Sequence, residues 1–525
     1  MNKTAKSFSI VTGFSILTRL VGFLYKIWMS RALGAETVGV YHIATSVIFM
    51  LFTLTAGAPT VLSRKVAEAV ANGDSKRANA LACASMLIGL TTAGVLVALS
   101  LVLKSHLGII FSNPDCIPIF LILTPTLVTS TLYASLRSWF WGHKKFVSFS
   151  STELLDEVTK LILSVVFAGG ITSFCSPSQG VALAMTISDF VCVVVLAVMF
   201  FTAGGRMAKP SGFKELLKSM IPLSATRILT STTLSLVALV IPKLLASSGL
   251  SMAEATAEYG RVAGMALPLI MAPITLVSSL SIVFIPDVAG LRAQGKMSEL
   301  RGKLSTLTLF SLIIAATFFA LYLPLGEGLG ELLFKDAEAG KYVSYCSVLL
   351  FPVALANATT PMLNSLGKEK NTLITTVAGG VVCLPLILLT KVIGSYAIAL
   401  CSGTCFLVTA ILNCIVLHKE IGSFADAKKC LVLILLFLPL AISGYFGERL
   451  LGAVVGNVTS VIVISVYTLF FAFLLINAFD IVDVVGFLRL LKPAKVTLHR
   501  SPSGEKHNKN PLGTRRTKRL SRRAR

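Results

Sequence analysis

Two basic side chains lie inside the first long apolar stretch of the chain, where a buried charge is costly. That stretch, from Phe8 to Leu33, contains Arg19 and Lys26 and is long enough to cross a bilayer, since a spanning helix needs about 20 residues. The two cations are seven residues apart, so a helix places them on one face, with Gly22 between them. A cation near the membrane centre costs about 3 kcal/mol or more. This cost predicts that the two residues line a water-filled cavity and bind an anionic substrate.

Each cation also has a structural explanation. The Lys26 side chain can extend its ammonium group to the membrane surface, which explains Lys26 alone as well as a function does. Arg19 can pair with a carboxylate or a backbone carbonyl, but it lies well inside the stretch, where burying a charge is costly. For Arg19 we therefore favour a function.

The composition of the chain predicts the environment of these charges. Of its 525 residues, 55% are hydrophobic and 14% are charged, and the mean hydropathy is +0.83. Soluble domains carry roughly 25% charged residues. We therefore expect an all-α polytopic membrane protein rather than a soluble enzyme. The first apolar stretch is too long for a signal-peptide core and lacks a cleavage pattern, so we expect a retained first span.

Apolar windows predict about 14 transmembrane helices. Basic residues are concentrated in the loops after even-numbered spans: with Lys3 and Lys6 there are 21 before the C-terminal tail, against seven in the other loops. Because basic loops stay in the cytoplasm, we expect both termini there and an even number of spans. The predicted spans are residues 8–31, 37–63, 79–103, 115–141, 151–171, 179–202, 215–242, 259–286, 302–325, 342–366, 371–391, 395–417, 430–447 and 453–477.

An internal repeat divides these spans into two halves. Gly73 after the second span matches Gly295 after the eighth at an offset of 222 residues, and Gly142 matches Gly367 at an offset of 225. Parallel repeats of six spans are typical of transporters that rock two halves around a central site, with chance similarity of linkers as the alternative. The predicted parts are two six-helix lobes, 1–205 and 206–418, two additional helices in 419–477, and a surface helix with a basic cytoplasmic tail in 478–525.

Much of the net charge of +23 comes from the C-terminal end. From Arg489 to Arg525 there are 13 Lys and Arg and one acid, so this segment contributes +12. After a run of membrane spans we expect it on the anionic inner leaflet, with membrane lipids as partners and no nucleic acid. Residues 63–79 and 478–492 are predicted to lie along the inner surface as amphipathic segments.

No pattern in the sequence indicates catalysis, a cofactor or a metal site. The ten cysteines are scattered, and Cys401 and Cys405 share a helix face without the nearby His or second Cys pair that a zinc site needs. The sequence has no Walker A motif, no H-E-x-x-H motif and no Gly-rich strand–helix turn. Energy for transport is then expected from an ion gradient, the membrane potential or the substrate's own gradient.

Cations dominate the first, seventh and eighth predicted spans. In the fifth span, Asp156 and Lys160 are expected to pair, and Glu153 and Glu157 are expected to be solvated near the inner end, while Asp189 is a further acid in the sixth. A guanidinium binds phosphate through two parallel hydrogen bonds, so several cations in one cleft suit a diphosphate. Packing of arginine against backbone carbonyls is the alternative. The predicted substrate-binding residues are Arg19, Lys26, Arg64, Arg227 and Arg261.

A resemblance to a known family is carried by two runs near the N-terminus. These are TRLVGFLYKIWMSRALGAETVGVY, from Thr18 to Tyr41, and GAPTVLSRK, from Gly57 to Lys65. They resemble the polysaccharide-flippase branch of the multidrug/oligosaccharidyl-lipid/polysaccharide exporter superfamily, and the chain is similar to the lipid II flippase family across its predicted spans. The resemblance implies a two-lobe transporter that moves undecaprenyl-pyrophosphate-linked saccharides to the outer leaflet of a bacterial plasma membrane by alternating access.

The resemblance also implies roles for some of the cations. Lipid II flippases use a cationic central cavity, and Arg19 fits one of its arginines. Arg261 lies where the family has an Asp-Arg pair, although Gly260 stands here in place of the aspartate. Lys26 and Arg64 are weaker matches.

Four functions follow as interpretations. The leading one is a flippase for a peptidoglycan precursor, with the spore cortex as a destination, and the second is a flippase for another polyprenyl-linked glycan. A multidrug cation exporter is disfavoured, because the first span offers Arg19 and Lys26 rather than acids. The fourth is a non-transporting scaffold that recruits cell-wall synthesis enzymes, which predicts that charge reversal at buried arginines leaves function intact.

Overall fold

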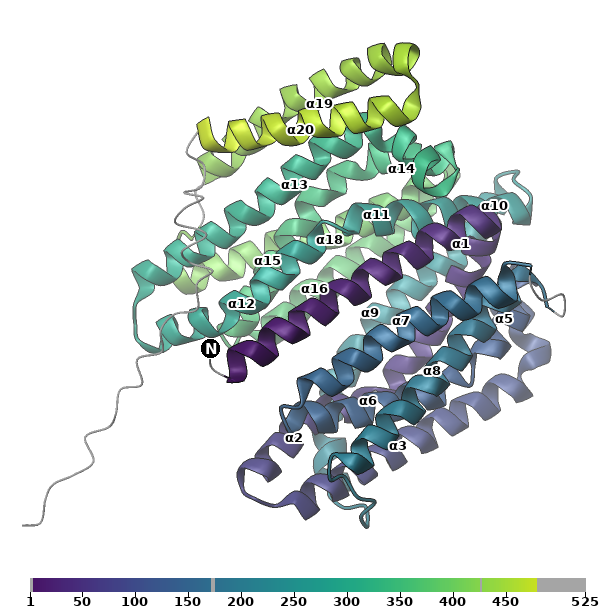
Figure 1. Ribbon diagram of the computed structural model, residues 1–525, viewed down its shortest axis with the longest axis vertical. Coiled ribbons are helices and arrows are strands. Elements are labelled where there is room, and N and C mark those ends of the chain that lie inside the picture. Colours follow the sequence, from purple (N-terminus) through teal and green to yellow (C-terminus); the bar gives the residue numbers. More distant parts are fainter. Residues whose placement is uncertain (1–2, 171–174, 425–426, 479–525) are drawn as a thin grey trace, which may run out of the picture. The chain divides into compact units, whose positions relative to one another are not determined.

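The computed structural model describes residues 3–170, 175–424 and 427–478, and every regular element in these ranges is a helix (Figure 1). The predicted all-α membrane fold is confirmed, because the described residues include 11 segments long and apolar enough to cross a membrane. The predicted fifth and eighth spans coincide with α7 and with α10–α12, which are not among those 11. The predicted number of spans is therefore approximate. The predicted surface helix at 478–492 and the basic tail lie outside the described residues, apart from residue 478.

The first lobe contains the helices of the N-terminal half. In Figure 1, α2, α3, α6, α7 and α8 lie together on one side of the first part of α1. Their bounds and those of the shorter elements are α1 (Lys3–Thr55), α2 (Gly57–Ala71), α3 (Ser75–Val102), η1 (Lys104–His106), α4 (Leu107–Ile110), α5 (Cys116–Leu123), α6 (Thr126–Gly142), α7 (Phe146–Ala168) and α8 (Pro177–Thr202).

The second lobe repeats this pattern and is followed by two further helices. The last two helices, α19 and α20, pack against α13 through an apolar cluster of their own (Figure 1). The elements are α9 (Phe213–Ser247), α10 (Met252–Tyr259), the π-helix η2 (Gly260–Ala266), α11 (Leu267–Met271), α12 (Ile274–Ala293), α13 (Met297–Phe334), α14 (Ala337–Cys346), η3 (Ser347–Leu349), α15 (Leu350–Ser365), α16 (Glu369–Cys383), η4 (Leu384–Leu389), α17 (Thr390–Ile393), α18 (Tyr396–Ile421), α19 (Ala427–Val455) and α20 (Asn457–Ala478).

The long helix α1 contains two predicted spans separated by a kink. Gly34 at the kink has φ 77° and ψ 171°, a conformation that residues with a side chain rarely adopt. This position lies between the predicted spans 8–31 and 37–63. The sequence therefore locates the break correctly, and a glycine makes the break possible.

The region after α1 is divided differently from the prediction. The second part of α1 ends at Thr55 and a separate helix, α2, begins at Gly57, so the predicted span end at residue 63 is wrong. Helix α2 packs against α3 and α6, and its Val66 is fully buried. The predicted surface segment 63–79 is thus the end of α2 and the start of α3.

Matching turns at helix ends establish the register of the internal repeat. Gly73 after α2 and Gly295 after α12 each donate a backbone N–H to the carbonyl three residues back, and the next residue donates to the carbonyl five back. This agrees with the predicted offset of 222. The same turn after α6 and α15 pairs Lys144 with Gly367, an offset of 223. The predicted match of Gly142 with Gly367 is therefore wrong by two residues.

The lobes meet where the second part of α1 crosses α10 and η2. Gly39 lies against the backbone of Thr256, and Gly260 lies against the backbone of Ala35, so the missing Cβ atoms let the two helices touch. Asn113 of the first lobe donates a buried hydrogen bond of 3.0 Å to the Thr256 hydroxyl. These residues adjoin the loops that the sequence predicts to be outside, so the two lobes are in direct contact at this end.

Helix α9 extends the contact between the two halves of the chain. The hydroxyl of Ser235 donates a hydrogen bond of 2.7 Å to the Ser46 carbonyl, and the hydroxyls of Thr53 and Ser231 are 3.1 Å apart. The first helix of the second half thus packs along the second part of α1. The predicted domain boundaries themselves stay predictions.

Candidate functional site

The five predicted cations lie on four helices and differ in exposure. Arg19 on α1, Arg64 on α2 and Arg227 on α9 are exposed, whereas Lys26 on α1 and Arg261 on η2 are half-buried. Arg19 and Lys26 share the first part of α1, as their spacing requires. Arg19 and Lys26 therefore lie on one helix, and the other three cations lie on three different helices.

Arg261 binds two carboxylates of its own lobe. Its Nε donates to Asp336 at 2.9 Å and its Nη1 donates to Glu258 at 2.7 Å, with 27% of the side chain exposed. Glu258 also accepts hydrogen bonds from the Tyr342 hydroxyl and, at 3.2 Å, from the Ser395 hydroxyl. These contacts fix η2 to α14 and α18 beside the lobe junction. A role for Arg261 in phosphate binding stays a prediction.

The face of α1 that carries Gly22 contacts a carboxylate of α7. A Cβ atom on Gly22 would lie 3.3 Å from Glu157 Oε2, so the glycine leaves the space that this carboxylate needs. Lys26 lies one turn further along α1 and interacts electrostatically with Glu157. Arg19, about one turn in the other direction, is exposed. The face of α1 that carries Arg19, Gly22 and Lys26 therefore lies near Glu157, a carboxylate of the same lobe.

Lys160 of α7 is held between two carboxylates and an aromatic ring. Its Nζ lies 3.0 Å from Glu157 Oε1, 3.8 Å from Asp156 Oδ2 and 5.7 Å from the centroid of the Tyr25 ring. The side chain is 13% exposed. The predicted pairing of Asp156 with Lys160 is present, but the expectation that Glu157 is solvated is wrong, because it shares this buried ammonium group.

Two more acids of the first lobe have different partners. Glu153 of α7 pairs with Arg137 of α6 at 2.8 Å, so the expectation that Glu153 is simply solvated is also wrong. Asp189 of α8 accepts a hydrogen bond of 2.9 Å from Ser130 of α6. In the described part of the chain no Lys or Arg forms an ion pair with Asp189.

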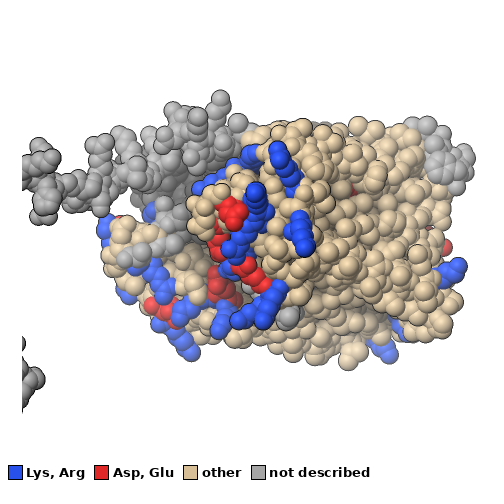
Figure 2. Space-filling model, turned by 90° about the horizontal axis from the view of Figure 1, so that it is seen from below, with Lys and Arg blue, Asp and Glu red and all other residues tan. Residues whose placement is uncertain are grey.

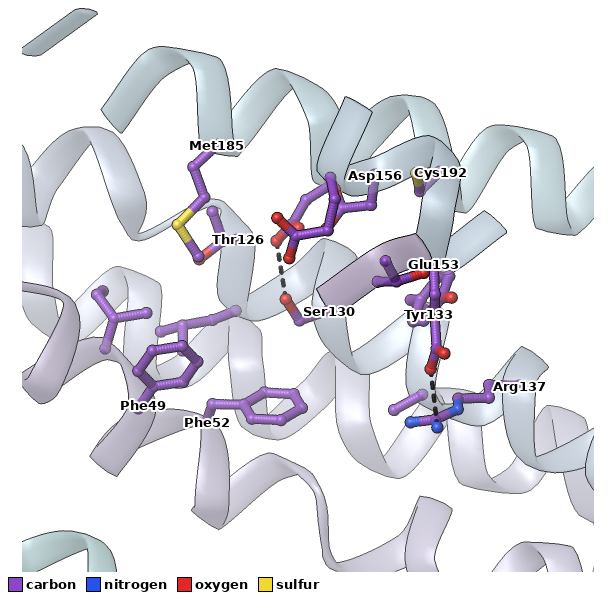
Figure 3. Close-up of a pocket in the computed structure, with 16 residues that line it drawn as sticks. Phe49, Phe52, Thr126, Ser130, Tyr133, Arg137, Glu153, Asp156, Met185 and Cys192 are labelled. Carbon is purple, nitrogen blue, oxygen red and sulfur yellow. Dashed lines mark hydrogen bonds and ion pairs between the residues drawn. The ribbon is translucent and has the colours of Figure 1, made fainter. Parts of the chain in front are cut away.

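The four acids and Arg137 line a cavity of about 400 Å³ between α1, α6, α7 and α8 (Figure 3). Figure 3 shows the rings of Phe49 and Phe52 across the cavity from Asp156. With every group ionised, the cluster carries a net charge of −2. Its charged members are the acids Glu153, Asp156, Glu157 and Asp189 and the basic residues Arg137 and Lys160.

A separate charged cluster joins α2, α3 and α9 next to the loops predicted to be cytoplasmic. Glu215 lies 2.7 Å from the Lys65 ammonium group and 3.3 Å from the Arg77 guanidinium. The hydrogen bond from Lys65 holds the pKa of Glu215 below its usual value, and the same bond raises the pKa of Lys65. Figure 2 shows a face on which basic and acidic side chains gather beside a broad uncharged surface, as a boundary between water and membrane requires.

The acidic lining of the cavity is a candidate functional feature that the sequence did not predict. Glu153, Asp156 and Glu157 lie at helical spacing inside a predicted span, and burying a carboxylate in a membrane is costly, as it is for a cation. The helical spacing of these three acids within a predicted span could therefore have indicated the acidic lining. The position of Asp189 opposite these residues required the packing of α8 against α7.

The fold and these groups define a class of protein: a two-lobe helical membrane protein with ionisable residues inside the bundle. Intramembrane ionisable groups of this kind mark substrate and ion pathways. Over residues 3–170, 175–424 and 427–478, no group of three or more His, Cys, Asp and Glu is arranged to hold a metal ion.

The chain belongs to the polysaccharide biosynthesis protein family, whose model matches residues 4–291. It is 22% identical over 357 residues to stage V sporulation protein B of Bacillus subtilis (strain 168), a match that covers 64% of this chain and 67% of that protein. The resemblance to the polysaccharide-flippase branch that the sequence carries is thereby confirmed.

Two solved structures share the fold at low sequence identity. The lipid II flippase MurJ in its inward closed conformation matches with a TM-score of 0.69 and 12% identity, over 89% of this chain and 99% of that one. A multidrug resistance MATE family transporter of the MOP superfamily, in an inward-facing conformation, matches with a TM-score of 0.66 and 14% identity, over 78% and 95%. Both of those proteins are named as transporters or flippases, and the likeness shows that this chain shares their fold.

Proposed function

We propose that the chain is a flippase that moves an undecaprenyl-pyrophosphate-linked saccharide, a lipid II-like peptidoglycan precursor, across the cytoplasmic membrane by alternating access. Family membership and the fold shared with a lipid II flippase support this proposal. The similarity to stage V sporulation protein B favours the spore cortex as the destination of the precursor. Both termini are then cytoplasmic, with the basic tail on the inner leaflet.

The observation that carries the proposal is the pair of cations on the first part of α1. Seven residues of helix separate Arg19 from Lys26 by about 10 Å along the axis, a span that a pyrophosphate and its first sugar can cover. Arg19 is exposed and Lys26 is half-buried, so an entering headgroup meets Arg19 first and Lys26 deeper in the bundle. The exposed Arg64 and Arg227 add positive charge on α2 and α9.

The glycine contact at Gly39 and Gly260 suits this mechanism. It brings the helix backbones of the two lobes into direct contact at one end of the lobe junction. In the proposed cycle, the closed end opens as the lobes rock and releases the headgroup on the other side of the membrane.

Charge reversal on α1 tests the proposal. The full chain is reconstituted in vesicles with a fluorescent undecaprenyl-pyrophosphate-linked disaccharide, and translocation is followed by quenching of the outer-leaflet label. Arg19→Glu and Lys26→Glu are each expected to reduce the rate at least about tenfold, because a phosphate contact becomes a repulsion. Arg31→Glu, an exposed reversal on the same helix, is the control. Unchanged rates in both variants would refute the proposal.

A second candidate function is export of an organic cation. The observation in its favour is the acid-lined cavity with Phe49 and Phe52 on its wall, because carboxylates and aromatic rings together bind organic ammonium ions. The sequence disfavoured this function because the first span has no acid, but α7 and α8 supply the acids instead. Uptake of a labelled tetraalkylammonium ion into the same vesicles, without movement of the lipid, would favour it over the flippase.

A further inference from the structure

We propose, on the basis of the flippase function above, that the cavity of the first lobe binds a primary ammonium group carried by the headgroup of the lipid-linked saccharide. Recognition then has two parts. The cations of α1 hold the phosphates, and the carboxylates of α7 and α8 hold an amine further along the headgroup. The protein would therefore bind glycans that carry a free amine in preference to glycans that carry no charge other than that of the phosphates.

The charges of the cavity favour an additional cation. Glu153 is paired with Arg137, and Asp156 and Glu157 share Lys160. Among the described residues, Asp189 has a hydroxyl partner but no basic one. A nearby positive charge stabilises an ionised carboxylate in the interior of a membrane protein, because its desolvation is otherwise costly. A ligand ammonium beside Asp189 supplies this charge.

The size and walls of the cavity fit an organic ammonium better than a bare metal ion. Its volume of about 400 Å³ is far larger than one ion needs and lies in the range of small-molecule sites. The described acids are not grouped closely enough to coordinate a metal. Phe49, Phe52 and Tyr133 line the cavity together with the carboxylates, and aromatic faces attract organic cations.

The position of the cavity next to α1 lets one headgroup reach both sites. Thr18 lines the cavity, and the next residue, Arg19, is exposed. Lys26 lies about 12 Å further along the helix axis. A headgroup that places its phosphates between Arg19 and Lys26 can therefore extend an amine-bearing arm past Thr18 towards Asp189.

The test compares two lipids that differ only at the amine. The first is an undecaprenyl-pyrophosphate-linked saccharide with one free primary amine, and the second is the same lipid with that amine acetylated. Binding to the full chain in nanodiscs is measured for each. We expect the free amine to bind at least about tenfold more tightly, because a charged hydrogen bond to a carboxylate is lost on acetylation.

Variants at Asp189 locate the effect. Asp189→Asn is expected to bring the preference for the free amine close to one, while Asp189→Glu retains most of it. Asp115→Asn is the matched control, because Asp115 is exposed at the start of α5 and does not line the cavity. Phe52→Leu, which removes a ring but keeps an apolar side chain, is expected to reduce the preference even if Asp189→Asn fails to fold.

Each other outcome overturns a defined part of the account. If both lipids bind equally and Arg19→Glu weakens both, the ammonium site is wrong and the flippase function stands. If neither lipid binds, the flippase function is wrong as well. If a free tetraalkylammonium ion binds in an Asp189-dependent way while neither lipid depends on Asp189, the cation comes from a free solute and the proposed source is wrong.

Discussion

A single methyl group at Gly260 tests whether the glycine contact holds the lobes together. The Cβ of alanine would lie 2.7 Å from Gly39 N and 3.0 Å from Gly39 Cα, and it would also meet the Ala35 carbonyl oxygen. These are backbone atoms of a helix and cannot turn aside, and the Ala35 oxygen is the nearest of them, so the helices must separate by more than about 1 Å to restore ordinary van der Waals contact. Overpacking of this kind costs about 1–3 kcal/mol, which shifts the equilibrium from closed to open by about 5- to 150-fold.

A native cysteine beside the junction reports this opening. Cys116 is fully buried and its Sγ lies 3.8 Å from the Val40 carbonyl oxygen. In a chain with the other cysteines replaced, we expect Gly260→Ala to speed the reaction of Cys116 with a membrane-impermeant thiol reagent added outside, by a factor in the range above. Gly94→Ala is the control, because a Cβ atom there meets nothing within 4 Å. If the Gly260→Ala variant is labelled at Cys116 and transports its substrate at the same rates as the chain with Gly260, the reasoning is refuted.

Two further predictions concern stability. Lys144 has a φ of 57°, a backbone conformation that costs a residue with a side chain about 1 kcal/mol. Lys144→Gly should therefore raise the free energy of unfolding, measured by chemical denaturation, by about 0.5–1 kcal/mol. A loss of stability would contradict the assigned turn. Lys65 lowers the folded-state pKa of Glu215. The ionised carboxylate therefore stabilises the fold fully above its unfolded-state pKa of about 4.3, and this stabilisation is lost as the pH falls through the lower folded-state pKa. Glu215→Gln should therefore lower the melting temperature at pH 7 and flatten its decline on acidification below about pH 5, whereas parallel pH profiles would argue against the ion pair.

The fold was predictable because the membrane imposes a simple pattern on the sequence. Apolar stretches of spanning length and basic loops define most of the helices. The break at Gly34 and the repeat register at Gly73 and Gly295 were also predictable, since glycine is the residue that adopts these backbone conformations. The second repeat match failed because the turn equivalent to that at Gly367 has Lys144 in place of a glycine. The nearest glycine, Gly142, was therefore matched to Gly367 instead.

The site was predictable in part. The unusual charges Arg19 and Lys26 stood out within one apolar stretch, and helical spacing alone places them on one face. Of the two partners of Arg261, Glu258 lies three residues away at helical spacing, whereas Asp336 lies 75 residues away and approaches only through the packing of α14 against η2. The cavity around Asp189 likewise depends on contacts between helices, which sequence spacing within one helix does not contain.

The central claim is that cations on α1 hold the phosphates of a lipid-linked saccharide. The most direct measurement is mass spectrometry of lipids that co-purify with the full chain and with its Arg19→Glu, Lys26→Glu double variant. We predict a polyprenyl-pyrophosphate saccharide bound to the unmodified chain and at least about a tenfold loss of it from the variant. Equal amounts of that lipid in both samples, or none in either, would contradict the claim.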